Sequence, residues 1–358
     1  MKGEVVWFYA FDVANEIHRE RVEEVLAEKP TPFVIRRDHT TPRDVPFQQP
    51  LSVEPDLKLS VAGLPARVQV RIYDVGVVSI AVRIGFDKPS IEDLSPYHRP
   101  TVDGGGTLDQ FATELCAKVI DGIAGAIKQP APPTEPEAYT VFCITDLGPM
   151  QHTGHWLEAN RSAVAGLLSD IPPLKLSESQ TAEVLRHQRT CETTDMVVID
   201  WDAALLIDLK EYIDDTLYVL ELANLQLEEF RALDRLLDRY LNQAYEHLEK
   251  RERWKLGGST AVLRKLRWFR VDLTRLADEV THITKFIGDW HLARVYESAK
   301  DRFHIDEWRA SVEQRLKQLD ELFSVVHSEI AERRMLVLEI VVVILILIEV
   351  LNTIFGGH

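Results

Sequence analysis

The sequence predicts an α+β N-terminal domain followed by a long antiparallel three-helix stalk, whose last helix continues as a single C-terminal transmembrane helix. Alternating apolar residues indicate strands early in the chain, and apolar residues three and four positions apart indicate long helices later. An almost unbroken apolar run then closes the chain. We therefore expect an α+β domain at residues 1–208, with a possible internal linker at 129–137, a coiled-coil-like stalk at 209–334 and the membrane helix at 335–355.

Composition excludes several classes of protein. The chain has 358 residues, with 41 Lys and Arg against 57 Asp and Glu, and a formal net charge of −16. A general nucleic-acid binder needs clustered cations, so direct nucleic-acid binding is not expected. Three widely spaced cysteines exclude a disulfide framework and favour a reducing compartment. Acidic residues come too early for a secretory signal, and the N-terminus lacks the bias of a transit peptide.

The N-terminal part mixes strands and helices. Val68–Ile72 and Val78–Ile84 alternate apolar and polar residues around a turn near Asp74–Gly76, which predicts an antiparallel hairpin. Further strands are predicted at Val5–Phe11, Tyr139–Thr145 and Met196–Trp201, and helices at Ala14–Glu28, Leu108–Ile127, Trp156–Leu168 and Ser177–His187. The proline-rich segment 129–136 predicts a stiff extended linker.

Three long helices follow. In the first, an apolar stripe from Leu220 to Leu248 is interrupted at Asp234, and Gly257-Gly258 ends the helix. In the second, apolar residues from Val262 to Ile287 alternate steps of four and three, the 3.5-residue repeat of a supercoiled seam. After a turn at residues 304–306, a third helix of about 50 residues is predicted to run to the apolar end.

The apolar run at residues 335–355 predicts a tail anchor. Its 21 residues rise roughly 31 Å, the thickness of a bilayer core. Arg333 and Arg334 precede it and place the rest of the chain in the cytoplasm by the positive-inside rule. Glu339 and Glu349 are about 80° apart around the helix. We expect both to turn toward neighbouring helices in a homo-oligomer, or else to snorkel toward the interfaces.

Candidate sites for chemistry are weak. Gly104, Gly105, Gly106 and Thr107 precede a helix and could hold an anion, although Thr107 as a helix N-cap is the simpler interpretation. His152 and His155, with Cys143 upstream, lack a closed set of metal ligands. We expect no catalytic residues, no cofactor and no metal.

Three segments carry a resemblance to a known family. They are Asp200-Trp201-Asp202-Ala203-Ala204, the run from Phe286 to Tyr296 (FIGDWHLARVY), and the pair Leu338-Glu339 and Ile348-Glu349-Val350. Over roughly residues 195–355 the chain resembles the DUF155 family, also called the required-for-meiotic-nuclear-division group, and the missing transit peptide fits a bacterial-type member. The resemblance implies a membrane-anchored homo-oligomer that acts as a scaffold or tether, and it supplies no catalytic residues.

The expected function is therefore a tail-anchored, homo-oligomeric scaffold, whose partners are the lipid bilayer, its own copies and an unknown protein. A first alternative is a CorA-like ion-conducting or ion-sensing assembly, although the chain lacks the second membrane helix and Gly-Met-Asn loop of such channels. A second alternative is a nucleotide-binding or hydrolytic N-terminal domain that uses the loop at Gly104–Gly106.

Overall fold

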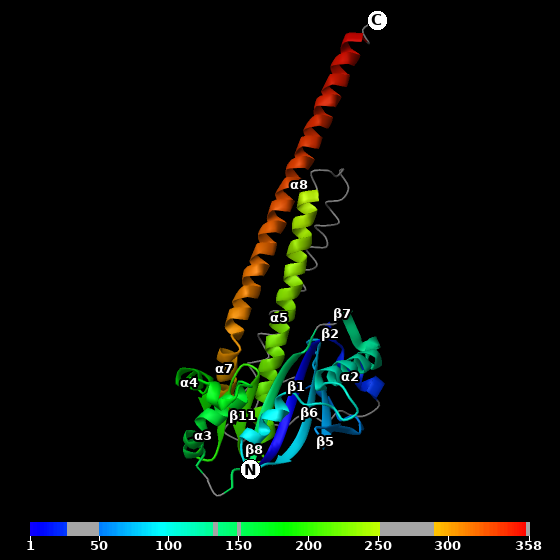
Figure 1. Ribbon diagram of the computed structural model, residues 1–358. Helices are drawn as coiled ribbons and strands as arrows, with labels where there is room; N and C mark the ends of the chain where they lie inside the picture. Colours follow the sequence, from blue (N-terminus) through cyan, green and yellow to red (C-terminus); the bar gives the residue numbers. More distant parts are fainter. Residues whose placement is uncertain (27–49, 132–134, 149–151, 251–289, 356–358) are drawn as a thin grey trace. The chain divides into compact units, whose positions relative to one another are not determined.

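The computed structural model describes residues 1–26, 50–131, 135–148, 152–250 and 290–355. Two compact units divide the chain. Unit 1 comprises Met1–Ala232 and Asp278–Arg309, and unit 2 comprises Leu233–Ala277 and Ala310–His358. The second predicted stalk helix, with Gly257-Gly258 and the stripe from Val262 to Ile287, lies outside the described residues (Figure 1).

Unit 1 is built on a mixed β-sheet. Within the described residues the sheet has nine strands in the order β3-β5-β6-β1-β8-β11-β10-β9, with β4 paired to β5. Only the β8–β11 pair is parallel among these neighbours. The strands are β1 (Lys2–Asp12), β3 (Leu51–Val53), β4 (Leu59–Val61), β5 (Leu64–Ile72), β6 (Val77–Asp87), β8 (Glu137–Asp146), β9 (Gln188–Arg189), β10 (Met196–Ile199) and β11 (Ala203–Ile207).

Helices cover both faces of the sheet. Each strand contributes to both faces, because successive side chains of a strand point to opposite sides. On the first face, Val5, Trp7, Tyr9 and Phe11 of β1 join a large apolar core. The helices that contribute to this core are α1 (Arg19–Leu26), α2 (Leu108–Gly122), α3 (Thr153–Leu168) and α4 (Glu178–Val184), with the 3-10 helix η1 (Glu92–His98). On the second face, Ala10 packs against Tyr218, Leu222 and Leu225 of α5 (Ile213–Lys250).

The second face is also closed by α7 (Trp290–Arg302). Tyr296 of α7 donates its hydroxyl to Gln226 of α5. Phe303, just after α7, meets the Tyr139 ring of β8 edge-on at 5.1 Å between centroids. Residues 215–230 of α5 are buried throughout, which is the burial expected of a helix with neighbours on every side. Unit 1 is thus a three-layer arrangement of helix, sheet and helix (Figure 1).

In unit 2, the later part of α5 lies beside α8 (Ile305–Phe355), and the two run in the same direction. Asp234 accepts hydrogen bonds from Ser311 and from Arg315, and Arg315 also reaches Asp238 at 2.6 Å. Leu237 and Leu241 are buried on the same stretch of α5, as are Val312 and Leu319 of α8. Asp234 therefore interrupts the apolar stripe because it serves an ion pair between the helices.

The predicted membrane anchor requires correction. Among the residues that the structure describes, no helix is both long enough and apolar enough to cross a membrane. The predicted transmembrane helix at 335–355 and the single-pass membrane location are therefore wrong. The bilayer as a partner stays a prediction, and α8 is continuous as expected.

Several local predictions can be compared with the structure. The hairpin is confirmed as β5 and β6, and the turn at residues 303–304 separates α7 from α8. The helix predicted at Ala14–Glu28 is wrong at its start, because residues 14–17 form β2 (Ala14–Ile17). That strand pairs with β7 (Ile127–Pro130), so the predicted linker begins inside a strand, while residues 132–134 lie outside the described residues.

Thr107 caps α2 as predicted. Its hydroxyl accepts from the Gln110 backbone, and the Gln110 side chain accepts from the Thr107 backbone, a reciprocal capping box. Thr107→Ala should lower the free energy of unfolding by about 1 kcal/mol, because the first turn of α2 loses a hydrogen-bond acceptor. Thr107→Ser keeps the hydroxyl and should stay near wild type in urea denaturation. Equal stabilities for the two variants would contradict this role.

Candidate functional site

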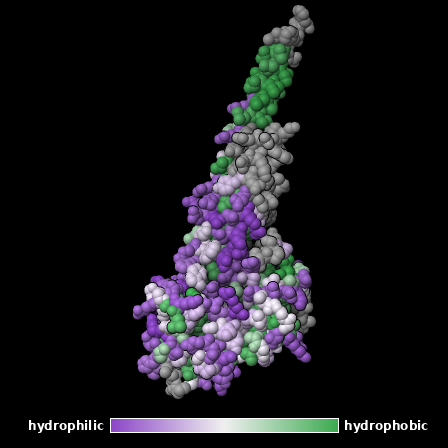
Figure 2. Space-filling model, viewed as in Figure 1, coloured by the Kyte–Doolittle hydropathy of each residue, from purple (hydrophilic) through white to green (hydrophobic). Residues whose placement is uncertain are grey.

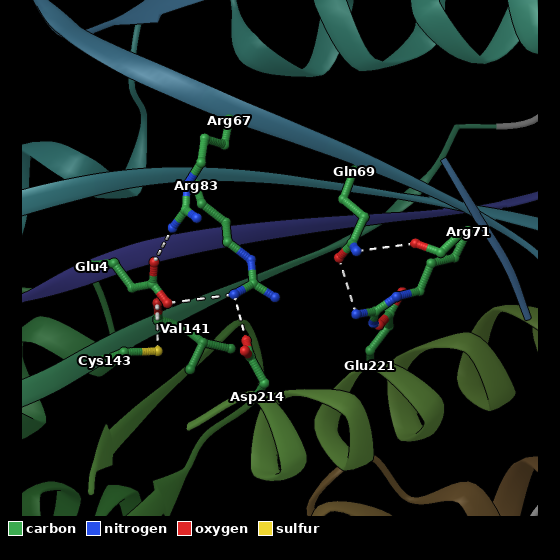
Figure 3. Close-up of polar contacts among 10 residues, drawn as sticks. Glu4, Arg67, Gln69, Arg71, Arg83, Val141, Cys143, Asp214 and Glu221 are labelled. Carbon is green, nitrogen blue, oxygen red and sulfur yellow. Dashed lines mark hydrogen bonds and ion pairs between the residues drawn. The ribbon is translucent and has the colours of Figure 1, made fainter. Parts of the chain in front are cut away.

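Charged side chains of the sheet and of α5 meet where α5 crosses the second face of the sheet. We call Glu4, Arg71, Arg83, Asp214 and Glu221 the charged seam (Figure 3). Glu4 comes from β1, the arginines from β5 and β6, and the other two carboxylates from α5. The polar positions of an alternating strand usually face water. Here α5 covers them and supplies the opposite charges.

The seam contains two ion-pair groups. Arg83 reaches Asp214 at 2.6 Å and Glu4 at 3.4 Å. Arg71 pairs with Glu221, both almost completely buried, and also donates to Gln69 at 3.0 Å. Figure 3 shows the two groups apart, Arg83 with Glu4 and Asp214 and Arg71 with Glu221 and Gln69. Since a buried charge needs a partner, these pairs select the position of α5 along the sheet.

Burial and the neighbouring carboxylates act in opposite directions on the pKa values of the seam arginines. Burial lowers the pKa of Arg71. For Arg83, burial also acts to lower the pKa, but Asp214 and Glu4 outweigh it and raise the pKa overall. Burial raises the pKa of the neighbouring Tyr73 to about 12, despite the opposing charge of Arg71. With Arg71 and Glu221 only 3% and 1% exposed, this pair is closed to ligands, and its role is structural.

A cavity of about 350 Å³ opens on the first face of the sheet, and we call it the β1–β8 pocket. Its floor is made by Trp7 and Tyr9 of β1 and by Thr140 and Ala138, the residues directly opposite them on β8. The sheet register therefore builds the floor. Trp7, Tyr9 and Thr140 are buried beneath it.

Charged side chains form the rim of the pocket. Asp109 comes from the first turn of α2, Arg99 follows η1, Asp170 follows α3 and Asp202 precedes β11. Tyr9 donates its hydroxyl to Asp109 at 2.8 Å, and Arg99 pairs with Asp170 at 3.2 Å. Asp170 has a positive φ of 52°, an uncommon backbone conformation for a residue with a side chain.

His98 lies in the wall of the pocket. Its Nε2–H donates to the carbonyl oxygen of Leu167, and its ring meets Phe142 at 5.0 Å. Burial is the largest influence on His98 and lowers its pKa, although Leu167, Asp170 and Asp202 act in the opposite direction. Neutral His98 therefore adds no positive charge to the pocket near neutral pH.

The sites predicted from the sequence do not come together in this pocket. Gly104, Gly105 and Gly106 form an exposed loop with positive φ at each glycine. The Gly105 amide donates to Val102, and the Thr107 and Gln110 amides are occupied by the capping box, which leaves fewer donors for an anion. No described residues form a group of three or more that could hold a metal ion; the rings of His152 and His155 are 5.4 Å apart, and Cys143 is buried in β8.

The predicted assembly residues lie on α8. Glu339 and Glu349 are exposed there, as are the apolar residues around them. Arg333 and Arg334 belong to α8, but their side chains lie outside those that the structure describes.

Neither the pocket nor the seam was predicted from the sequence. Tyr9, Asp109, His98, Asp170 and Asp202 are distributed over nearly 200 residues, so no local motif joins them. In the sequence, some of these aspartates stand beside the predicted start of a helix or strand. Aspartates are common at such positions, so their placement does not identify a site.

Comparison with known proteins adds a family. The family described as "Uncharacterized protein MJ0711, N-terminal domain" matches residues 2–213. Uncharacterized protein MJ0711 of Methanocaldococcus jannaschii is 23% identical over 217 residues, which are 60% of this chain and 65% of that relative. The chain thus covers less than two thirds of the relative's length. No solved structure matches.

The matched region contains every residue of the β1–β8 pocket and ends at the start of α5. It overlaps the DUF155 resemblance only at residues 195–213, so that resemblance stays a prediction.

Removing one partner of the buried Arg71–Glu221 pair should strongly destabilise the fold. Glu221→Ala should lower the free energy of unfolding by about 3–5 kcal/mol, because Arg71 is left as an uncompensated buried charge. The double variant Arg71→Met/Glu221→Met should recover most of that loss in urea denaturation. As a control, Arg161→Ala breaks the exposed pair with Glu158 and should cost no more than about 1 kcal/mol. A mild effect of Glu221→Ala would refute the structural role of the seam.

The lowered pKa of His98 predicts a pH dependence of stability. Below the ordinary value of 6.5, the unfolded chain protonates His98 while the folded chain keeps it neutral, so the free energy of unfolding falls as the pH drops. His98→Gln should make that fall smaller between about pH 7.5 and about pH 5. The slope should not vanish, because burial also lowers the pKa of His187. An unchanged slope in denaturation series at several pH values would contradict the prediction.

Proposed function

We propose that this chain, which belongs to the family of the MJ0711 N-terminal domain through residues 2–213, is a homo-oligomeric scaffold. The apolar part of α8 would assemble the oligomer. The observation that carries the proposal is the exposure of that segment. Assembly would bring several copies of unit 1 together, where they could bind a protein partner in multiple copies.

The apolar part of α8 is Met335–Leu351, apart from Glu339 and Glu349. The large apolar side chains in this range are 44–67% exposed in the single chain. Figure 2 displays it as a continuous hydrophobic surface. Contiguous apolar patches larger than a few hundred Å² are rare on monomers and mark interaction sites. Fully burying each Val, Leu or Ile side chain is worth about 1.5–3 kcal/mol, so pairing only part of this segment would be favourable.

The spacing of residues within the segment favours a second copy of the chain as its partner. A 3.5-residue seam, with alternating steps of four and three, runs through Val337, Val341, Ile344, Ile348 and Leu351. At this repeat, Glu339 lies about 180° and Glu349 about 130° from the centre of the seam. Both carboxylates then stay hydrated when two or more copies pair, which avoids the cost of burying a charge. They would also limit which faces of the helix can associate.

The resemblance of residues 195–355 to the DUF155 family supports the same proposal, because it implies homo-oligomers. The alternative of a CorA-like ion-conducting or ion-sensing assembly requires a membrane span, and it gains no support from the described helices. The nucleotide-binding alternative gains no support from the loop at Gly104–Gly106, where amides are already engaged.

The assembly can be tested with charges placed in the seam. The full-length protein should sediment as an oligomer at low micromolar concentration, and the double variant Ile344→Lys/Ile348→Lys as a monomer, because paired lysines would repel and lose apolar burial. Ser324→Lys, an exposed position on the same helix, is the matched control and should keep the wild-type mass. A monomeric wild-type chain, an oligomeric double variant, or monomers that partition into lipid vesicles would overturn the proposal.

A further inference from the structure

The charges of the β1–β8 pocket do not balance. Three carboxylates, those of Asp109, Asp170 and Asp202, face a single arginine, Arg99. Arg99 is already engaged by Asp170 at 3.2 Å. Within the described part of the chain, no lysine or arginine forms an ion pair with Asp109 or Asp202. The pocket therefore presents a net negative potential, which disfavours phosphates and carboxylates as ligands.

The floor of the pocket includes two buried aromatic residues. Trp7 and Tyr9 lie side by side in the alternating pattern of β1, both on the first face of the sheet. Hydrogen bonds fix both rings, since Trp7 donates to the Tyr97 carbonyl at 2.9 Å and Tyr9 donates to Asp109. Because Trp7 and Tyr9 are only 2% and 3% exposed, they supply a rigid base that excludes water beneath the charged rim.

The carboxylates of the pocket do not make up a metal-binding cluster. Among the described residues, no group of three or more His, Cys, Asp or Glu side chains could hold a metal ion. A ligand with cationic groups at two ends could reach Asp109 and Asp202 at once across the aromatic floor. The volume of about 350 Å³ lies in the range of small-molecule sites.

We propose that the β1–β8 pocket binds a small organic cation of the amine or guanidinium class, held by Asp109 and Asp202 over Trp7 and Tyr9. Asp109 acts with its position fixed by the Tyr9 hydroxyl, and Asp202 acts from the turn before β11. The site lies entirely in unit 1 and does not depend on assembly through α8.

Isothermal titration of the full-length protein with agmatine, putrescine and spermidine tests the proposal. At least one should bind, while the uncharged analogue 1,4-butanediol and Mg²⁺ alone should not. Asp109→Asn and Asp202→Asn should each weaken binding about tenfold. Both substitutions keep the side-chain shape, and the new amide oxygen in Asp109→Asn can still accept from the Tyr9 hydroxyl. Asp121→Asn, an exposed aspartate at the far end of α2, is the matched control and should bind as wild type.

Three results would overturn the proposal: no heat with any of the three amines at millimolar concentration, binding that both pocket variants leave unchanged, or equal weakening by Asp121→Asn. The last would indicate attraction by the chain's net negative charge rather than a site. Circular dichroism of each variant should match that of the wild type, so a lost signal can be assigned to the pocket.

Discussion

The pairing of Arg71 with Glu221 joins the sheet to α5, and much of unit 1 depends on it. In a three-layer fold, the helices of the second layer must take one position on the sheet. Apolar packing alone tolerates small shifts of a helix along the sheet. A buried ion pair does not, because a displaced partner leaves a charge in a medium that solvates it poorly. On the neighbouring strand β6, the ion pairs of Arg83 with Asp214 and Glu4 favour the same position of α5.

The same sheet carries a different kind of surface on its other side. Alternation along β1 sends Tyr9 and Trp7 to the first face and leaves Glu4 and Ala10 for the second. One strand thus contributes to a closed structural seam and to an open pocket. Rigidity supplied by the seam benefits the pocket, because Trp7 and Thr140 keep their positions only while β1 and β8 keep their register.

In unit 2 the same principle acts between helices. Asp234 breaks an apolar stripe and is met by Arg315 and Ser311, so a polar contact specifies the alignment of α5 with α8. Further along α8, the apolar side chains of Met335–Leu351 stay exposed in the single chain, and the two glutamates restrict association to one side of the helix. Assembly through this segment and ligand binding in the pocket would use separate parts of the chain.

Periodicity in the sequence determined the β5–β6 hairpin, the cap at Thr107 and the long helix α8, because each depends on residues close together in the chain. The apolar run at the end of the chain predicted a membrane anchor, but no helix of the described residues is long and apolar enough to cross a membrane. Tertiary structure alone decided that Gln69 and Arg71 lie under a helix instead of in water, and that Tyr9, His98, Asp109 and Asp202 share one cavity. Such residues meet through sheet register and helix packing, and the free energy of those contacts depends on neighbours that are distant in the sequence.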